Sequence, residues 1–211
     1  MLSLHALPEK TIERLSQYRR VLLKISKQQN KDNIFSHEIA SILHITSVQV
    51  RRDLMLIGYS GSQRKGYQIK MLIQLISSII DAKNGQRIAL VGVGNLGSAI
   101  IPYLNSKKKS KLQIIASFDI NPDKINRKIS GVNCYHLDEL PSIIKKENIT
   151  IGIITAPDDA AWSIAEMLIS AGIKGILNFT STSLRILNKN VFVEEYDMIT
   201  LLEKVAYFAN K

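Results

Sequence analysis

The sequence of 211 residues contains one cysteine, five prolines and no long uninterrupted hydrophobic run. A single cysteine, Cys134, excludes an intramolecular disulfide and a cysteine metal cluster, and its apolar neighbours predict that it is buried. The longest apolar stretch, residues 71–80, contains polar residues and is too short to span a bilayer, so we expect no membrane partner. Because low-complexity tracts are also absent, the whole chain is expected to fold.

The start of the chain lacks a signal peptide pattern, because Pro8, Glu9 and Lys10 interrupt its apolar residues. We therefore expect a cytoplasmic protein. The length suggests two domains. The net charge of +10 is uneven: residues 1–80 hold 12 Lys and Arg against 5 Asp and Glu, and residues 81–211 hold 16 against 13. The basic first part favours a polyanionic partner, nucleic acid ahead of a membrane, although a basic soluble surface has the same composition.

Three helices are predicted in the first 60 residues. Apolar side chains recur at helical spacing over residues 11–27, and Ser36 is placed to cap a short second helix. Thr46 or Ser47 is placed to cap a third helix. The apolar stripe of this third helix consists of Val50, Leu54 and Ile57.

The second and third helices resemble a helix-turn-helix, in which the later helix enters the major groove of DNA. Polar residues that suit bases or phosphates lie on that later helix: Ser47, Gln49, Arg51 and Arg52. Gln49, Arg51 and Arg52 lie outside the apolar stripe and are expected to face solvent. Two alternatives remain open, namely pairing of the arginines with Asp53 and a generic three-helix cap.

A wing is predicted after the third helix. Gly58 and Gly61 end the helix, and the basic tip that follows carries Arg64 and Lys65, which would contact phosphate or the minor groove. Scattered histidines give no metal site, so we expect no metal.

A dinucleotide-binding fingerprint is predicted in the second part. A buried strand over residues 87–91 precedes a glycine loop, a helix over 98–104 and a second strand over 112–118. This order places helix N–H groups beside a pyrophosphate. The loop consists of Gly92, Val93, Gly94, Asn95, Leu96 and Gly97.

Asp119 follows the second strand, where a carboxylate binds the adenosine ribose of NAD(H) and repels the 2′-phosphate of NADP(H). A Rossmann-like domain that has lost its ligand is the alternative. Thr155, Ala156 and Pro157 end a later strand and are expected to line the nicotinamide side, unless Pro157 only starts the next helix.

Further strands are predicted over residues 131–135, 149–155 and 175–179, with helices over 137–146 and 159–171. A final apolar helix over residues 198–209 would cover its own sheet or cross to the second subunit of a homodimer.

No catalytic grouping accompanies the fingerprint. The only histidine after the glycine loop is His136, and no Tyr-x-x-x-Lys or Ser/His/Asp set occurs. The sequence favours a regulator without enzymatic activity over the two alternatives, a dehydrogenase and a regulator that binds coenzyme A.

The sequence resembles the Rex family of redox-sensing transcriptional repressors from residue 12 almost to the end. The resemblance rests on Arg14, Tyr18 and Arg20, on residues 48–54 (Val-Gln-Val-Arg-Arg-Asp-Leu), Gly66-Tyr67, the glycine loop, Phe118-Asp119, and residues 171–179 (Ala-Gly-Ile-Lys-Gly-Ile-Leu-Asn-Phe).

The resemblance implies a homodimer with exchanged C-terminal helices, which binds palindromic double-stranded operator DNA with NAD+ and is released by NADH. It implies that Gln49, Arg51 and Arg52 contact DNA. It further implies that Tyr103 responds to nicotinamide redox state, and that Arg20 and Asp197 form an ion pair in one state. Such a pair would contribute free energy to one conformation only.

The sequence departs from the family pattern twice. The wing reads Ser-Gln-Arg-Lys-Gly-Tyr over residues 62–67, where the family has Lys-Arg-Gly-Val-Gly-Tyr, and Met198 replaces an aromatic residue after Asp197. The predicted fold is α/β: a winged helix-turn-helix domain (residues 1–83), then a doubly wound, mostly parallel Rossmann domain with a swapped C-terminal helix (residues 84–211).

Overall fold

The computed structural model describes residues 7–28, 31–62, 64–82, 85–106, 111–184 and 190–210. The chain separates into two compact units, Met1–Lys83 and Asn84–Lys211. Lys83 and Asn84, the pair at the predicted domain boundary, lie outside the described residues. Each unit is described by itself.

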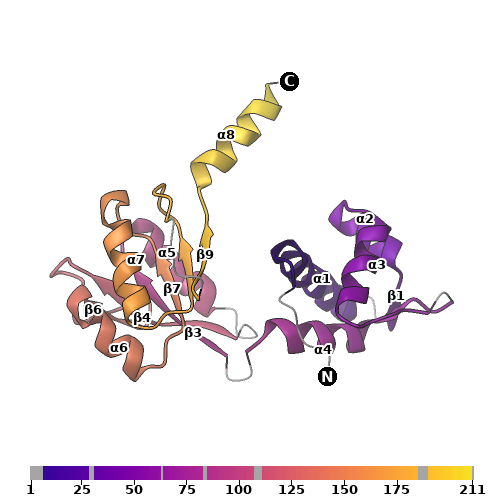
Figure 1. The fold of residues 1–211 in the computed structure, drawn as a ribbon, viewed down its shortest axis with the longest axis horizontal. Coiled ribbons are helices and arrows are strands. Elements are labelled where there is room, and N and C mark those ends of the chain that lie inside the picture. Colours follow the sequence, from indigo (N-terminus) through magenta and orange to yellow (C-terminus); the bar gives the residue numbers. More distant parts are fainter. Residues whose placement is uncertain are drawn as a thin grey trace. The chain divides into compact units, whose positions relative to one another are not determined.

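The first unit is a helical bundle with a small two-stranded sheet (Figure 1). Its amphipathic helices surround one core, in which Leu15, Tyr18, Leu22, Leu54 and Ile76 are fully buried. Strands β1 and β2 pair antiparallel. The elements are α1 (Glu9–Gln28), β1 (Asn33–Ile34), α2 (Ser36–Leu43), α3 (Ser47–Leu56), β2 (Tyr67–Gln68) and α4 (Ile69–Ile80).

The caps of the helix-turn-helix agree with the sequence at α3 and differ at α2. Thr46 is the N-cap of α3, where its hydroxyl accepts a hydrogen bond from the Gln49 N–H at 3.1 Å. The prediction that Ser36 caps α2 is wrong by one residue, because Phe35 is the N-cap. The Glu38 carboxylate accepts a hydrogen bond from the Phe35 N–H at 2.9 Å, so a helical side chain does the capping.

The predicted wing is a tight hairpin between α3 and β2. Ser62 and Gly66 exchange two backbone hydrogen bonds of 3.0 and 2.8 Å, and Arg64 and Lys65 lie exposed at the tip. Gly66 has φ +68°, and a Cβ there would lie 2.5 Å from the Ile34 carbonyl oxygen. Only glycine satisfies both conditions.

The second unit is built on a seven-stranded sheet with the order β5-β6-β4-β3-β7-β8-β9. Apart from β5, the strands run parallel in the order of the dinucleotide-binding fold, with β3 first in sequence and the chain reversing direction across the sheet beside it. The strands are β3 (Gln86–Val91), β4 (Leu112–Asp119), β5 (Arg127–Ile129), β6 (Val132–His136), β7 (Ile151–Ile154), β8 (Gly175–Asn178) and β9 (Phe192–Glu195).

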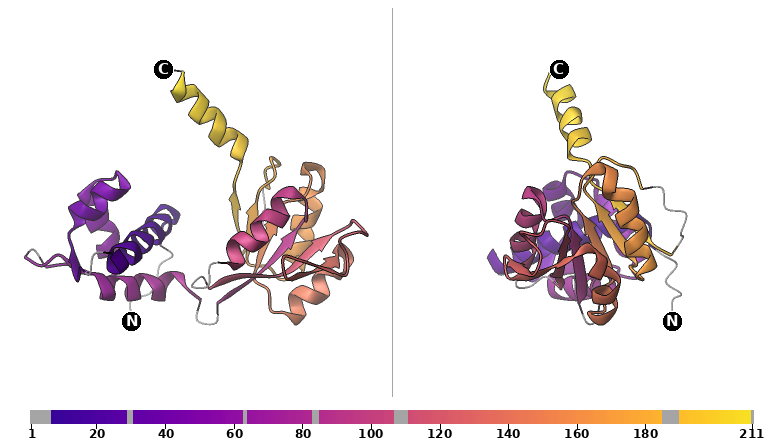
Figure 2. Two further views of the ribbon diagram at one scale, coloured as in Figure 1. Left: turned by 180° about the vertical axis from the view of Figure 1, so that it is seen from behind. Right: turned by 90° about the vertical axis from the view of Figure 1, so that its left-hand side faces the viewer.

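Helices cover both faces of this sheet (Figures 1 and 2). Helix α5 (Asn95–Asn105) packs on one face through Ile101, together with buried Cys134. Helices α6 (Leu140–Lys146) and α7 (Ala161–Ser170) pack on the other face around Phe118. Short 3-10 turns, Leu137–Glu139 and Asp158–Ala160, precede α6 and α7.

Two features of the second unit, strand β5 and the surroundings of the last helix, could not be predicted from the sequence. Strand β5, which was not predicted, forms an antiparallel hairpin with β6. Helix α8 (Met198–Ala209) has the predicted bounds and stands away from the sheet (Figures 1 and 2). None of its residues is buried, so it does not cover its own sheet.

Candidate nucleotide pocket and DNA-binding surface

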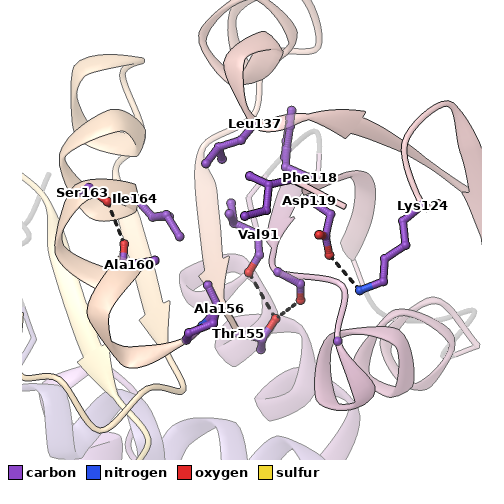
Figure 3. A pocket seen from close by; sticks show the side chains of 14 residues that line it. Val91, Phe118, Asp119, Lys124, Leu137, Thr155, Ala156, Ala160, Ser163 and Ile164 are labelled. Atoms are coloured by element: carbon purple, nitrogen blue, oxygen red, sulfur yellow. Dashed lines mark hydrogen bonds and ion pairs between the residues drawn. The ribbon is translucent and has the colours of Figure 1, made fainter. Parts of the chain in front are cut away.

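A pocket of about 450 Å³ lies at the carboxyl ends of the central strands of the second unit (Figure 3). Strands β3 and β4 contribute to it, together with the segments that follow β3, β4 and β7. The chain crosses from β3 toward β4 on one side and reaches β7 on the other, so the pocket lies where the winding direction reverses. Open α/β sheets bind ligands at this position.

The three glycines of the loop meet three different spatial demands. Gly92 has φ +93°, and a Cβ there would lie 2.6 Å from the Ala156 nitrogen. A Cβ at Gly97 would lie 2.2 Å from the Gly92 carbonyl oxygen, whereas a Cβ at Gly94 would meet nothing within 4 Å. Gly92 therefore permits the turn, Gly97 permits close helix-strand packing, and Gly94 leaves open space at the N-cap of α5. The N–H groups of the first helical turn are suited to an anion there.

Asp119 lies at the end of β4 on the pocket wall, with 11% of its side chain exposed. Its Oδ2 accepts hydrogen bonds from the Val93 N–H at 2.8 Å and the Lys124 ammonium at 3.2 Å, and its Oδ1 accepts one from the Asn121 N–H at 2.9 Å. Burial raises the pKa of Asp119, but these hydrogen bonds outweigh burial and hold the pKa below its ordinary value. Asp119 is therefore ionised at neutral pH, paired with the Lys124 ammonium on the same wall.

Thr155, Ala156 and Pro157 line the pocket. Figure 3 shows Thr155 and Ala156 across the pocket from Asp119. The Thr155 hydroxyl donates to the Gly92 carbonyl oxygen at 2.7 Å and reaches that of Val91 at 3.3 Å. It therefore fastens β7 to the glycine loop. Pro157 also precedes the 3-10 turn before α7, so the helix-start alternative and the pocket position both apply.

The other predicted nucleotide-binding residues are spread over α5 and its approach. The Val93 side chain is buried in the core under α5, so only its backbone faces Asp119. Asn95 and Leu96 are exposed on the first turn. Tyr103 is 62% exposed and is not among the residues that line the pocket.

Sequence reasoning missed most of the pocket wall. Lys124 follows Asp119 by five residues, and this short spacing between opposite charges was the one available signal. The remaining wall is largely apolar and, apart from Val91 and Phe118 at the ends of the two fingerprint strands, comes from segments with no motif. These residues are Val91, Phe118, Ile120, Leu137, Ala160, Ser163 and Ile164.

In the first unit, four of the residues predicted to contact DNA lie on α3, and two of these four are exposed. Arg51 and Arg52 are exposed, and an Arg51 N–H donates to the Ser36 hydroxyl at 3.3 Å. Ser47 and Gln49 are half-buried. The Gln49 amide donates to Asp53 at 3.0 Å, so the expectation that its side chain points freely to solvent is wrong.

Asp53 pairs with α1, which excludes its proposed pairing with Arg51 or Arg52. The carboxylate is fully buried and binds the Arg14 guanidinium through two hydrogen bonds, of 2.6 Å from Nε and 2.8 Å from Nη2. The Tyr18 hydroxyl donates to it at 2.6 Å. Burial raises the pKa of Asp53, but the hydrogen bonds from Arg14, Tyr18 and Gln49 lower it below its ordinary value.

Arg20 and Asp197, the predicted ion pair, belong to different units. Arg20 is exposed on α1. Asp197 is the N-cap of α8, where its carboxylate accepts hydrogen bonds from the Ile199 N–H at 2.8 Å and the Thr200 hydroxyl at 2.6 Å. The ion pair stays a prediction.

No described helix is both long and apolar enough to cross a membrane. Across the described part of the chain, no three His, Cys, Asp or Glu side chains gather as a metal site would require.

The fold and pocket define a two-domain protein in which a winged helix-turn-helix unit precedes a Rossmann unit with a dinucleotide-type glycine loop. Two family descriptions match these parts separately. "Putative DNA-binding protein N-terminus" matches residues 6–54, and "CoA binding domain" matches residues 83–182.

Full-length relatives identify the family. A redox-sensing transcriptional repressor Rex from Anoxybacillus flavithermus is 36% identical over 96% of this chain and 93% of its own length, and one from Lactobacillus acidophilus is 35% identical over 96% and 94%. Crystal structures of RSP, a Rex-family repressor, match at 31% identity and cover 97% of this chain. For the complex with β-NAD+ and operator DNA, the TM-score is 0.88 and the match covers 93% of the RSP chain. For the complex with β-NADH, the TM-score is 0.84 and the match covers 95% of the RSP chain. The chain belongs to the Rex family of redox-sensing transcriptional repressors.

Proposed function

We propose that the chain is a transcriptional repressor that binds operator DNA through its first unit and senses the NADH/NAD+ ratio through its second. One observation carries the proposal: a complete glycine loop opens onto a switch-point pocket in a chain whose helix-turn-helix exposes Arg51 and Arg52. RSP, which matches this chain over both units, has been crystallised with operator DNA and β-NAD+ and with β-NADH.

In the nucleotide site, we assign the pyrophosphate to the loop of residues 92–97 and the N-terminus of α5. The adenosine ribose is assigned to Asp119, and the nicotinamide to residues 155–157. Three of the four lone pairs of the Asp119 carboxylate already accept hydrogen bonds, so Asp119 alone cannot bind both ribose hydroxyls. The Lys124 ammonium, which only donates hydrogen bonds, would bind the oxygen of the second hydroxyl, and we assign it to the ribose as well.

On the DNA side, we assign base contacts to Gln49, Arg51 and Arg52, and phosphate contacts to Ser47 and to the wing residues Arg64 and Lys65. Arginine pairs with guanine or phosphate, and the amide of Gln49 suits adenine. The exposed wing tip would track the backbone next to the major groove.

Coupling between the units is assigned to Tyr103, Arg20 and Asp197. Asp197 caps α8, so pairing it with Arg20 would move the start of that helix together with the DNA-binding unit. NADH would then shift the balance between two conformations, provided that it binds one of them more tightly.

The exposed face of α8 supports a homodimer. Five apolar side chains along one stripe of this helix are each at least 45% exposed, and such a face is stable in water only when a partner covers it. These residues are Met198, Leu201, Leu202, Val205 and Phe208. We propose a second copy as that partner, with the two helices exchanged, and a palindromic operator that matches its two-fold symmetry.

We further propose that the protein has no enzymatic activity and acts in the cytoplasm, where its operator DNA is. Among the described residues that line the pocket, Asp119 and Lys124 are the only ionisable ones, and they bind each other. A dehydrogenase needs a general acid or base beside the nicotinamide, and residues 155–157 on that side carry no ionisable side chain, since the Thr155 hydroxyl is bound to the Gly92 carbonyl oxygen.

The proposal is tested by measuring DNA binding of the full-length protein against the NADH/NAD+ ratio. The DNA is a duplex selected from a random library by the protein itself. We expect NADH to weaken binding and NAD+ to leave it intact, and Asp119→Ala to bind the same duplex without responding to NADH. Equal affinity at saturating NAD+ and NADH would contradict the proposal.

Coenzyme A is the second candidate ligand, because the family description that matches residues 83–182 names it. The same assay includes coenzyme A and acetyl-coenzyme A in place of NADH. A response to either, without a response to NADH, would replace the redox assignment. Turnover of NADH with a small carbonyl compound would support the dehydrogenase instead.

A further inference from the structure

One buried carboxylate connects the DNA-reading helix with the first helix of the chain. Asp53 lies on α3 with no exposed surface, and its two oxygens receive hydrogen bonds from three side chains. Arg14 and Tyr18 come from α1, and Gln49 comes from the preceding turn of α3. The Thr11 hydroxyl lies 3.5 Å from the same carboxylate. The network therefore links the packing of α3 against α1 to the side-chain conformation of Gln49.

The chemistry of this contact gives the Gln49 side chain one orientation. A carboxylate only accepts hydrogen bonds, so the amide nitrogen of Gln49 must face Asp53 and the amide oxygen must face away. A carboxamide without such a partner can turn by 180° and exchange the two positions. Asp53 removes this freedom by binding the nitrogen at 3.0 Å.

The orientation decides what Gln49 offers to a base. One N–H is used by Asp53, and the amide oxygen and the second N–H remain. A bidentate contact to adenine requires both groups: the amide oxygen accepts from the adenine N6 amino group, and the amide N–H donates to adenine N7. The turned amide would present its groups in the wrong order.

We propose that Asp53 is a specificity-positioning residue, which holds the Gln49 carboxamide in the orientation that reads adenine and anchors α3 to α1 through Arg14 and Tyr18. The inference rests on the proposed DNA-binding function and deepens it: Asp53 touches no base, yet it sets the preference at one operator position.

The test compares three variants of the full-length protein on the selected duplex and on each of its single-base variants. Gln49→Met removes the amide and identifies the position that Gln49 reads. Asp53→Asn keeps the shape but replaces one acceptor oxygen by an N–H donor, so it cannot bind all of its donors. We expect it to keep the two 2.6 Å bonds from Arg14 and Tyr18 at Oδ2 and to lose Gln49, which is bound at Oδ1 at 3.0 Å. Tyr18→Phe is the matched control, because it weakens the same carboxylate at Oδ2 while Gln49 is bound at Oδ1.

We expect Asp53→Asn to reduce the preference for adenine at the Gln49 position by roughly tenfold, with affinity for random-sequence DNA unchanged. Tyr18→Phe should lower thermal stability and keep the preference. In the Gln49→Met background, Asp53→Asn should not change the preference further. Retention of the full preference in Asp53→Asn, or its loss in Tyr18→Phe, would overturn the proposal.

A measurement on the wild-type protein covers the case in which Asp53→Asn does not fold. In a nitrogen-proton spectrum, one side-chain amide proton of Gln49, assigned by its loss in Gln49→Met, should exchange slowly with solvent. Rapid exchange of both protons would overturn the positioning. If the protein selects no duplex, the proposed DNA-binding function has failed. The exchange rate then tests by itself whether Asp53 holds the Gln49 amide in place.

Discussion

Each unit of this protein holds a charged carboxylate with lowered pKa, and the two carboxylates are surrounded in different ways. Asp53 is fully buried, and its hydrogen-bond donors are side chains from α1 and α3. Asp119 lies on a pocket wall, and two of its three donors are backbone N–H groups. One carboxylate joins elements of the fold, whereas the other is held by a rigid loop and leaves capacity for a ligand.

This difference suggests where each unit is sensitive. Removing the Arg14 partner of Asp53 leaves a buried charge unpaired, so we expect the free energy of unfolding of the first unit to fall. Changing the side chains around Asp119 leaves its backbone donors in place, so we expect the affinity for the ligand to fall while stability is kept. The following four predictions test this contrast, from the largest expected effect to the smallest.

Arg14→Met is expected to destabilise the first unit by about 3–5 kcal/mol, because it leaves the buried Asp53 without its cation. Denaturant unfolding followed by circular dichroism measures the loss. Arg19→Met is the control, because Arg19 pairs with Asp81 at a partly exposed site and should cost about 1 kcal/mol or less. NADH affinity should be unchanged in both variants. Equal stability of Arg14→Met and the wild type would contradict the role of the ion pair.

Gly94→Ala and Gly97→Ala should separate binding from folding in the second unit. A Cβ at Gly97 meets the Gly92 carbonyl oxygen at 2.2 Å, so this variant should lose both stability and NADH binding. A Cβ at Gly94 meets nothing in the protein but would occupy the expected place of the pyrophosphate. Gly94→Ala should therefore melt like the wild type while calorimetry shows NADH affinity reduced by roughly a hundredfold. Unchanged affinity would place the pyrophosphate elsewhere.

Asp119→Ala should weaken NADH binding by roughly tenfold or more, through loss of a charged hydrogen bond to the ribose. Lys124→Met should have a smaller effect of the same kind, and both should be measured by calorimetry. Neither variant should alter the unfolding of the first unit. A normal affinity for NADH in Asp119→Ala would remove Asp119 from the ribose site.

Acid should destabilise the first unit as the pH falls through the lowered pKa of Asp53. Because folding lowers this pKa, the ionised carboxylate contributes its full stability above the unfolded value of about 3.9 and progressively loses it below. Denaturant unfolding at pH 7, 5 and 3 measures the trend. Tyr18→Phe, which has one hydrogen bond fewer to Asp53, should show a weaker dependence on pH. An equal dependence would assign the effect to other carboxylates.

Periodicity and glycine spacing predicted the elements that carry strong local signals. The bounds of α8, the Thr46 cap and the strand-loop-helix order around Gly92 all agree with the structure. Strand β5 was missed because its three residues, Arg127–Ile129, show no apolar alternation and depend on pairing with β6. The pocket wall was missed for a related reason, since Leu137 and Ile164 look like ordinary core residues in the sequence.

Asp53 shows most clearly where local reasoning stops. In the sequence it is an acid beside two arginines, and charge proximity alone favours pairing with Arg51 or Arg52. On a helix, adjacent residues point in different directions, so Asp53 faces the core while both arginines face solvent. Its true partner, Arg14, is 39 residues away.

The sequence by itself determined the two-part organisation, the glycine loop and the exposed arginines, because each depends on the order of neighbouring residues. Only the tertiary structure decided which donors meet Asp53, that Lys124 shares the Asp119 carboxylate, and that α8 leaves its apolar face uncovered by its own unit. The first two depend on contacts between separate segments of the chain, and the third depends on what packs against the helix. Local sequence does not encode such distances, because packing of the whole unit sets them.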